Sequence, residues 1–531
     1  MRSYVHIRLI FFFALAAIYA GFPNARPDLT ELNSSDSEVY LSLSYAVTHG
    51  LGYTRSLVSG IYIPHTTFFP GFPLLLAPIT AFSSLPLAWL CIKIYMIGIG
   101  LTGIVLAWVY VRRLTNDVGS ADIAALLLAL LPYYWLLSRT AMTEIPSISY
   151  ILLTLVLVDL TWAQRPPRAW QVALVGLIAG LGMMLRGTNL CTIFAPLGYL
   201  IGSRKAVATP LGCLALFAFY GTSFCLPSIL WAVRNASIDP RGLGFDGIDE
   251  FRMIFASDWM DRESLYSVAE LLQRSIENFS WYAIYRLPQQ LIPGLWNAEW
   301  WNWPGAPFVA LGLTAAVALA ALPRTTVALP LALTIIPYAN FLSVYPRGGA
   351  VRYWAPVTAL LILLLVVNWR SVLEALSRRA RRATMAGLTA CYAVSLIGFV
   401  HKFEVSPYAD DFADMVALFD SVRNLLPPPP AVHVYHSCLF TLRTGFAAPI
   451  TIQARRVEPI YTHLILHNAG NPTVFSNPSG VVRQPALGSA LLLRRGEWGY
   501  YALPKPMTER ELSNDMNREA ERTDGRDRTV Y

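Results

Sequence analysis

About eleven apolar segments run through the chain, and they restrict its fold more than any other feature. A helix needs roughly 17–25 apolar residues to cross a bilayer. Only 14% of the 531 residues are charged, whereas a soluble domain carries about 25%. The sequence therefore predicts a mostly α, polytopic membrane helix bundle. The candidate spans are residues 7–22, 86–111, 121–138, 145–163, 170–185, 189–202, 209–232, 305–323, 326–344, 353–369 and 384–400.

Clusters of basic residues predict which loops face the cytoplasm. Short cytoplasmic loops are enriched in Lys and Arg, and one orientation, with the N-terminus inside, places every cluster on that side. The loops at 23–85 and 233–304 and the region after residue 400 then lie outside. We expect a bacterial inner membrane protein with a periplasmic or extracellular C-terminal region. The clusters are Arg2/Arg8, Arg112/Arg113, Arg165/Arg168, Arg204/Lys205, Arg324 and Arg378/Arg379/Arg381/Arg382.

The composition changes after the last span. Residues 1–400 form the predicted transmembrane domain. Residues 401–505 contain a helix-like stretch at 407–426 and short alternating apolar runs, which predict a small α/β domain. The charged segment 506–531 is expected to be disordered.

The first outer loop contains two distinct elements. Residues 36–53 have helical apolar spacing and end near Gly50, which predicts an interfacial amphipathic helix. Asp36 stands near its start, either as a cap or as a functional carboxylate. Prolines interrupt the following segment, 64–78, so a re-entrant or interfacial element is expected there instead of a span.

Ionisable residues at membrane depth are functional candidates by default. Glu144 is predicted at the outer end of a span, where it is either a helix-start residue or a site residue. Arg186 lies on the same side, in a structural ion pair or facing an anionic ligand. Arg347 and Arg352 border a later outer loop and are suited to lipid headgroups or to a bound phosphate. With Asp36 these residues suggest a general base beside an anion site.

Five motifs occur in the order seen in one family of enzymes. They read DSEVYLSLSYAVTHGLGY, PHTTFFPGFPLLLAP, MTEIPSISYILL, LGMMLRGTNL and RYWAP. Over residues 1–400 the chain resembles the GT-C superfamily of membrane glycosyltransferases. The resemblance is to the branch that contains protein O-mannosyltransferases and the aminoarabinose transferase of lipid A.

This resemblance implies transfer of a sugar from a polyprenyl-phosphate donor to a lipid, glycan or protein acceptor on the outer face. Asp36 would be the general base, with Glu38 as the fallback, and inversion at the anomeric carbon is expected. No cofactor or metal is required, although a divalent cation is kept as an alternative. Donor phosphate and sugar contacts are assigned to Tyr40, His65, Glu144, Arg186, Arg347 and Arg352.

The chain departs from the family pattern at three positions. His65 stands where relatives often have Lys, Ser37 follows Asp36 where Glu is usual, and the Arg186 motif lacks its proline. Two other functions stay open, a transporter or flippase of a lipid-linked anion and a non-catalytic scaffold. A transporter would need polar groups near the bilayer midplane, whereas the enzyme needs them around one outer cavity.

Overall fold

The computed structural model divides the chain into two compact units. The first comprises residues 1–23, 66–72 and 93–405, and the second 24–65, 73–92 and 406–531. The structure describes residues 35–58, 61–66, 68–81, 85–138, 140–162, 167–202, 210–238, 255, 266–291, 326–345, 351–374, 379, 432–434, 460–466, 490–495 and 498–508.

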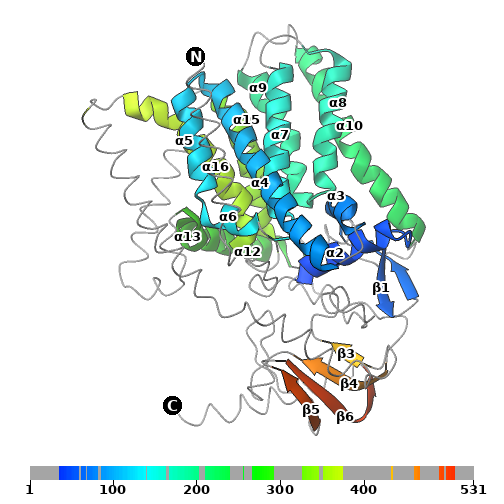
Figure 1. The fold of residues 1–531 in the computed structure, drawn as a ribbon. Helices are drawn as coiled ribbons and strands as arrows, with labels where there is room; N and C mark the ends of the chain where they lie inside the picture. The colour runs from blue at the N-terminus through cyan, green and yellow to red at the C-terminus, as the bar shows by residue number, and fades with distance from the viewer. Residues whose placement is uncertain are drawn as a thin grey trace. The chain divides into compact units, whose positions relative to one another are not determined.

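The first unit is a bundle of apolar helices, several of which run alongside one another (Figure 1). Four stretches are long and apolar enough to cross a membrane: Cys91–Thr115, Glu144–Trp162, Leu211–Ile238 and Arg352–Trp369. The longer helices are α4 (Leu85–Thr115), α5 (Val118–Ala129), α7 (Glu144–Trp162), α8 (Ala169–Met183), α10 (Pro210–Ile238), α15 (Leu329–Val344) and α16 (Ala355–Glu374).

Short elements connect these helices and occupy their ends. They are α6 (Pro132–Leu137), the 3-10 helix η1 (Gly187–Phe194), α9 (Ala195–Gly202), α12 (Val268–Ser280), the π-helix η2 (Trp281–Arg286), α13 (Leu287–Leu291) and the 3-10 helices η5 (Thr326–Ala328) and η6 (Val351–Trp354).

Helix α7 lies at the centre of the first unit. Its side chains are buried on several faces, from Ile145 and Ile148 near the start to Trp162 at the end. A helix that is apolar and buried around its circumference belongs inside a bundle. Its Tyr150 hydroxyl donates to the carbonyl of Ile178 in α8 at 2.6 Å, and Ser149 donates to the carbonyl of Ile99 in α4 at 3.0 Å.

Helices α8 and α10 approach each other through two glycines. A Cβ atom at Gly176 would lie 2.4 Å from the carbonyl oxygen of Tyr220, and one at Gly180 would lie 2.1 Å from that of Phe224. The spacing Gly-x-x-x-Gly permits such backbone contact between membrane helices. A larger residue at either position would force the pair apart.

Where the structure describes them, the predicted spans correspond to helical segments, with two corrections. The segment 189–202 was expected to be one helix but forms the 3-10 helix η1 followed by the short helix α9. The segment 121–138 was expected to be one helix but forms α5 and α6, because the backbone is extended at Leu131 before Pro132. Asp117 caps α5 through the N–H groups of Gly119 and Ser120. The segments 7–22, 305–323 and 384–400 lie outside the described residues, so the count of eleven stays a prediction.

The second unit begins with the expected helix of the first outer loop. Helix α2 (Ser35–Thr48) buries Val39, Tyr40 and Leu43, and ends before Gly50, whose φ is +72°. The left-handed conformation at Gly50 is easily reached only by glycine. The helix is thus confirmed, while its position on a membrane surface stays a prediction.

The proline-rich segment is also too short to span. Strand β2 (Ile61–Pro64) pairs antiparallel with β1 (Thr54–Val58), and α3 (Gly71–Thr80) follows. A helix of ten residues covers about 15 Å, half the thickness of the hydrocarbon core.

The C-terminal region contains a four-stranded sheet ordered β3-β4-β6-β5. Strand β3 (Val432–Val434) is parallel to β4 (Ile460–Leu466), and the other neighbours are antiparallel. Three of the strands fall in the runs predicted from the sequence, including β5 (Ala490–Arg495). Strand β6 (Trp498–Thr508) was not expected. The helix predicted at 407–426 lies outside the described residues, so the α/β domain as a whole stays a prediction.

Candidate active site

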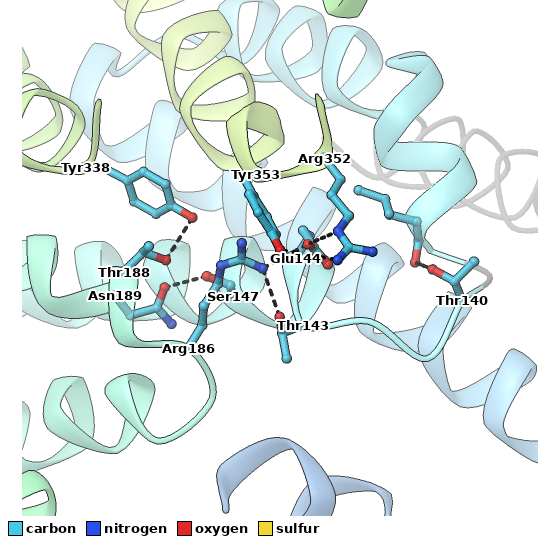
Figure 2. A network of polar contacts seen from close by, with 11 residues as sticks. Thr140, Thr143, Glu144, Ser147, Arg186, Thr188, Asn189, Tyr338, Arg352 and Tyr353 are labelled. Atoms are coloured by element: carbon cyan, nitrogen blue, oxygen red, sulfur yellow. Dashed lines mark hydrogen bonds and ion pairs between the residues drawn. The ribbon is translucent and has the colours of Figure 1, made fainter. Parts of the chain in front are cut away.

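Three predicted site residues meet at the start of α7. Glu144 is the first residue of that helix and has no exposed surface. Its Oε1 lies 2.9 Å from a terminal nitrogen of Arg186 and 3.5 Å from Nε of Arg352. Figure 2 shows the two guanidinium groups converging on the carboxylate from different segments. We call Glu144, Arg186 and Arg352 the Glu144 cluster.

The cluster is poorly accessible to water and carries an excess of positive charge. The side chains of Arg186 and Arg352 are 12% and 8% exposed. Among the described residues of the cluster, two guanidinium groups and one carboxylate sum to +1. Charge interactions in such a setting are screened far less than at an exposed surface. Two guanidinium groups of this kind match the donors predicted for a bound phosphate, and that role stays a prediction.

The two arginines also share an aromatic ring. The guanidinium carbons of Arg186 and Arg352 lie 5.0 and 5.1 Å from the centre of the Tyr353 ring, within the range of cation–π attraction. Arg352 additionally donates to the Tyr353 hydroxyl at 3.3 Å. Tyr353 therefore lies against both cationic groups, close to the carboxylate that they flank (Figure 2).

A network of hydrogen bonds holds the turn that carries Arg186. Arg186 precedes η1 and donates to Thr143 Oγ1 at 2.9 Å. The buried Asn189 side chain accepts from Ser147 on α7 and donates to the carbonyl of Gly182 on α8 at 2.9 Å. Because Asn189 bonds to both neighbouring helices, it fixes the turn between α8 and η1.

Two further contacts support the same turn. The Gly71 N–H, at the start of α3, donates to the carbonyl of Met184 at 2.7 Å. Thr188 donates to the Tyr338 hydroxyl on α15 at 2.9 Å. Arg186 is consequently positioned by elements from widely separated parts of the chain.

Aromatic stacking holds the turn that carries Arg352. This turn is η6, and its Trp354 is buried. Tyr282, on the π-helix η2, stacks on Trp354 with ring centres 4.8 Å apart and planes 6° from parallel. Phe279 meets the same ring edge-on at 6.5 Å. These rings restrict η6 and with it the backbone of Arg352.

A second ion pair marks the opposite end of α7. Arg113, in the last turn of α4, lies 2.5 Å from Asp159 Oδ2, and Tyr199 of α9 donates to Oδ1 of the same carboxylate at 2.9 Å. Asp159 follows Glu144 by fifteen positions, about 22 Å along the helix axis. Arg113, predicted to be cytoplasmic, and the Glu144 cluster thus lie at opposite ends of one helix.

The remaining predicted site residues lie in the second unit or outside the described part of the structure. Tyr40 and His65 are buried within the second unit. The side chains of Asp36 and Glu38, both on α2, lie outside the described part of the structure, as does all of Arg347. In the described part of the chain, no three or more His, Cys, Asp or Glu side chains are grouped to hold a metal ion.

Comparison with known proteins identifies the fold. Residues 75–231 match the family model described as dolichyl-phosphate-mannose-protein mannosyltransferase. The crystal structure of ArnT from Cupriavidus metallidurans bound to undecaprenyl phosphate matches 94% of this chain and 98% of its own, with a TM-score of 0.58 and 15% identity. The resemblance to the GT-C superfamily is confirmed.

The apo crystal structure of the same ArnT also matches. It covers 94% of this chain and 98% of its own, with a TM-score of 0.57 and 13% identity. A search of curated proteins by sequence returned no significant match. The matches give no support to the transporter alternative.

Proposed function

We propose that the protein is an integral-membrane glycosyltransferase that uses a polyprenyl-phosphate-linked sugar. The observation that supports this most directly is the buried Glu144 cluster, in which two arginines share one carboxylate. Arginine presents a planar fork of donors that matches phosphate. The ArnT-like fold and the match to the mannosyltransferase family model support the proposal that this cation pair binds a lipid-linked phosphate.

In the proposed reaction, the acceptor nucleophile attacks the anomeric carbon while the bond from that carbon to the phosphate oxygen breaks. The polyprenyl phosphate leaves with the bonding electrons, and the configuration inverts. Arg186 and Arg352 stabilise the charge that develops on the phosphate. Glu144 holds the two arginines together. Asp36 accepts the acceptor's proton, with Glu38 as the fallback base.

The proposed site lies on the extracytoplasmic face. Arg113 is at the other end of α7 from the Glu144 cluster, and the positive-inside rule assigns Arg113 to the cytoplasm. Tyr40, His65 and Arg347 are proposed to complete the donor site. His65 would contribute as a hydrogen-bond donor, because a neutral imidazole carries no charge to offer a phosphate.

The test is a transfer assay with a panel of polyprenyl-phosphate sugars and membrane extract as acceptor source. Arg352→Lys keeps the charge but loses the fork, so we expect kcat/KM for the donor to fall about 10- to 100-fold, as for a lost charged hydrogen bond. Arg168 is exposed at the start of α8, and Arg168→Lys is the matched control. Equal activity of the two variants would contradict the role of Arg352.

Asp36→Asn tests the base separately. We expect turnover to be abolished while polyprenyl-phosphate binding is retained. Normal turnover would transfer the role to Glu38. Dialysis against EDTA tests whether a divalent cation assists. Binding of the lipid-linked anion without consumption of any donor, together with its movement across a vesicle membrane, would favour a flippase instead.

A further inference from the structure

Helix α12 has its polar and apolar faces arranged opposite to those of a helix in a soluble protein. Its outward residues Val268, Leu272, Ile276 and Phe279 are between 48% and 73% exposed. Their spacing of three and four residues places them in one stripe along the helix. In water such a stripe would be turned toward the protein interior.

The face of α12 next to the stripe joins the bundle through polar groups. The buried Asn278 donates from its amide nitrogen to the carbonyls of Ser343 and Tyr345, each at 2.9 Å. Ser275 and Ser343 hydroxyls are 2.9 Å apart. These partners lie at the end of α15, so α12 is attached at the end of an apolar helix of the bundle.

A third face of α12 is acidic and exposed. Glu270, Gln273 and Glu277 follow one another at helical spacing, and Gln273 donates to Glu277 at 2.9 Å. Ser267 and Glu270 form a reciprocal capping box that defines the start of the helix. The helix thus has separate faces for protein, for water and for an apolar medium.

We propose that α12 lies along the membrane surface, with its apolar stripe in contact with bilayer lipid. Thirteen residues extend only about 20 Å, too short to cross the hydrocarbon core. An apolar stripe beside a water-facing polar edge is typical of interfacial helices. The partly exposed Trp281 follows directly, and tryptophan is enriched at headgroup level. The attachment to the end of α15 places the stripe at the level where a membrane helix leaves the bilayer.

This lipid contact is adjacent to the Arg352 turn. Phe279 of the stripe touches Trp354 of η6, and Tyr282 stacks on the same ring. The surface contact of α12 is therefore continuous with the aromatic packing that holds Arg352. The inference itself depends only on the faces of α12 and not on the proposed catalytic function.

Spin labels provide the test. Single cysteines are introduced at Leu272, Ile276, Gln273 and Glu277 in a full-length background whose native cysteines are replaced, and the protein is placed in nanodiscs. We expect Leu272→Cys and Ile276→Cys to show high collision with oxygen and low collision with a nickel chelate. Gln273→Cys and Glu277→Cys should show the reverse. High collision with the nickel chelate at all four positions would mean that the stripe faces water. Low collision with both reagents at Leu272 and Ile276 would mean that a protein partner covers it. Either result overturns the proposal.

A second measurement keeps the native cysteines. A photo-crosslinking phenylalanine derivative is incorporated at Leu272 or, as control, at Gln273, and the products are analysed by mass. Lipid adducts at position 272 and their near absence at 273 support the proposal. Adducts to protein at 272, or equal yields at both positions, contradict it.

Discussion

Replacing Glu144 with glutamine removes the carboxylate but preserves the shape of the side chain. In the variant the two guanidinium groups of the Glu144 cluster lose their shared counter-charge in a site with little access to solvent. Breaking a buried ion pair by removing one partner costs about 3–5 kcal/mol. We therefore expect the unliganded protein to lose about 3–5 kcal/mol of its free energy of unfolding.

The thermal shift follows from the size of the chain. An unfolding entropy of about 2 cal/mol/K per residue gives roughly 1 kcal/mol per degree for 531 residues. The Glu144→Gln midpoint should then be about 3–5 °C lower, measured by tryptophan fluorescence in nanodiscs. The control is Glu277→Gln, because Glu277 is exposed on α12. Its free energy of unfolding should change by less than about 0.5 kcal/mol.

The same variant should bind polyprenyl phosphate more tightly. A phosphate supplies the negative charge that the arginines have lost, so we expect Kd to fall about tenfold, equivalent to about 1.4 kcal/mol. An unchanged midpoint would refute the reasoning, because it would mean that the ion pairs contribute nothing to stability. A lower midpoint with weaker binding would show that Glu144 acts mainly by orienting the arginines.

Three further predictions concern the supports of the site and of α12. Gly71→Ala would bring a Cβ within 2.4 Å of the backbone oxygen that the Gly71 N–H binds. We expect the free energy of unfolding to fall by about 1–3 kcal/mol and KM for the donor to rise. The control is Gly98→Ala, where a Cβ has open space, and it should be neutral in both thermal and kinetic assays. Asn189→Leu leaves two buried polar partners unsatisfied. For each partner we expect the free energy of unfolding to fall by about 1–3 kcal/mol, and KM for the donor to rise. Wild-type values in the thermal and kinetic assays would contradict the positioning role of Asn189. Ser267→Ala removes the cap of α12 and should cost about 1 kcal/mol of helix stability, seen as faster hydrogen exchange in the first turn. Hydrogen bonds from Ser267 lower the pKa of Glu270 below its ordinary 4.5. The stabilisation by the wild-type cap is therefore present above pH 4.5 and lost as the pH falls through the lowered pKa. Exchange protection of the first turn that does not change with pH would refute this prediction.

The sequence predicted the Glu144 cluster because each member breaks a simple expectation. Glu144 is a carboxylate beside a long apolar segment, and Arg186 and Arg352 are basic residues outside the pattern of cytoplasmic charges. Residues that are costly in their environment are informative even without the structure. The site residues that a sequence reading identifies most readily are thus those with the greatest need for a partner.

The supporting residues were not predicted, for physical reasons. Asn189, Ser147 and Thr188 are uncharged polar residues that could equally be satisfied within their own helices. Their roles depend on which helices become neighbours. Tyr353 stands next to Arg352 in the RYWAP motif, but its position against Arg186 is a tertiary contact.

Two other features had a sequence signal that was overlooked. Gly176 and Gly180 form a Gly-x-x-x-Gly pair within an apolar segment, which indicates close helix packing. Asp159 is a carboxylate inside a predicted span, so the same rule that selected Glu144 applies to it. The break between α5 and α6 was likewise signalled by Pro132.

The Glu144 cluster also has a consequence for the order in which the protein is made. Ribosomes add roughly 5–20 residues per second, so Arg186 follows Glu144 within seconds, whereas Arg352 follows Arg186 by roughly 10–30 s. During that interval the carboxylate can pair with only one of its two final partners. The nascent chain therefore passes through a stage in which Arg186 alone balances Glu144, and the positive excess arises only when η6 arrives. The anion affinity proposed for the cluster therefore requires η6, which is made long after α7 and α8.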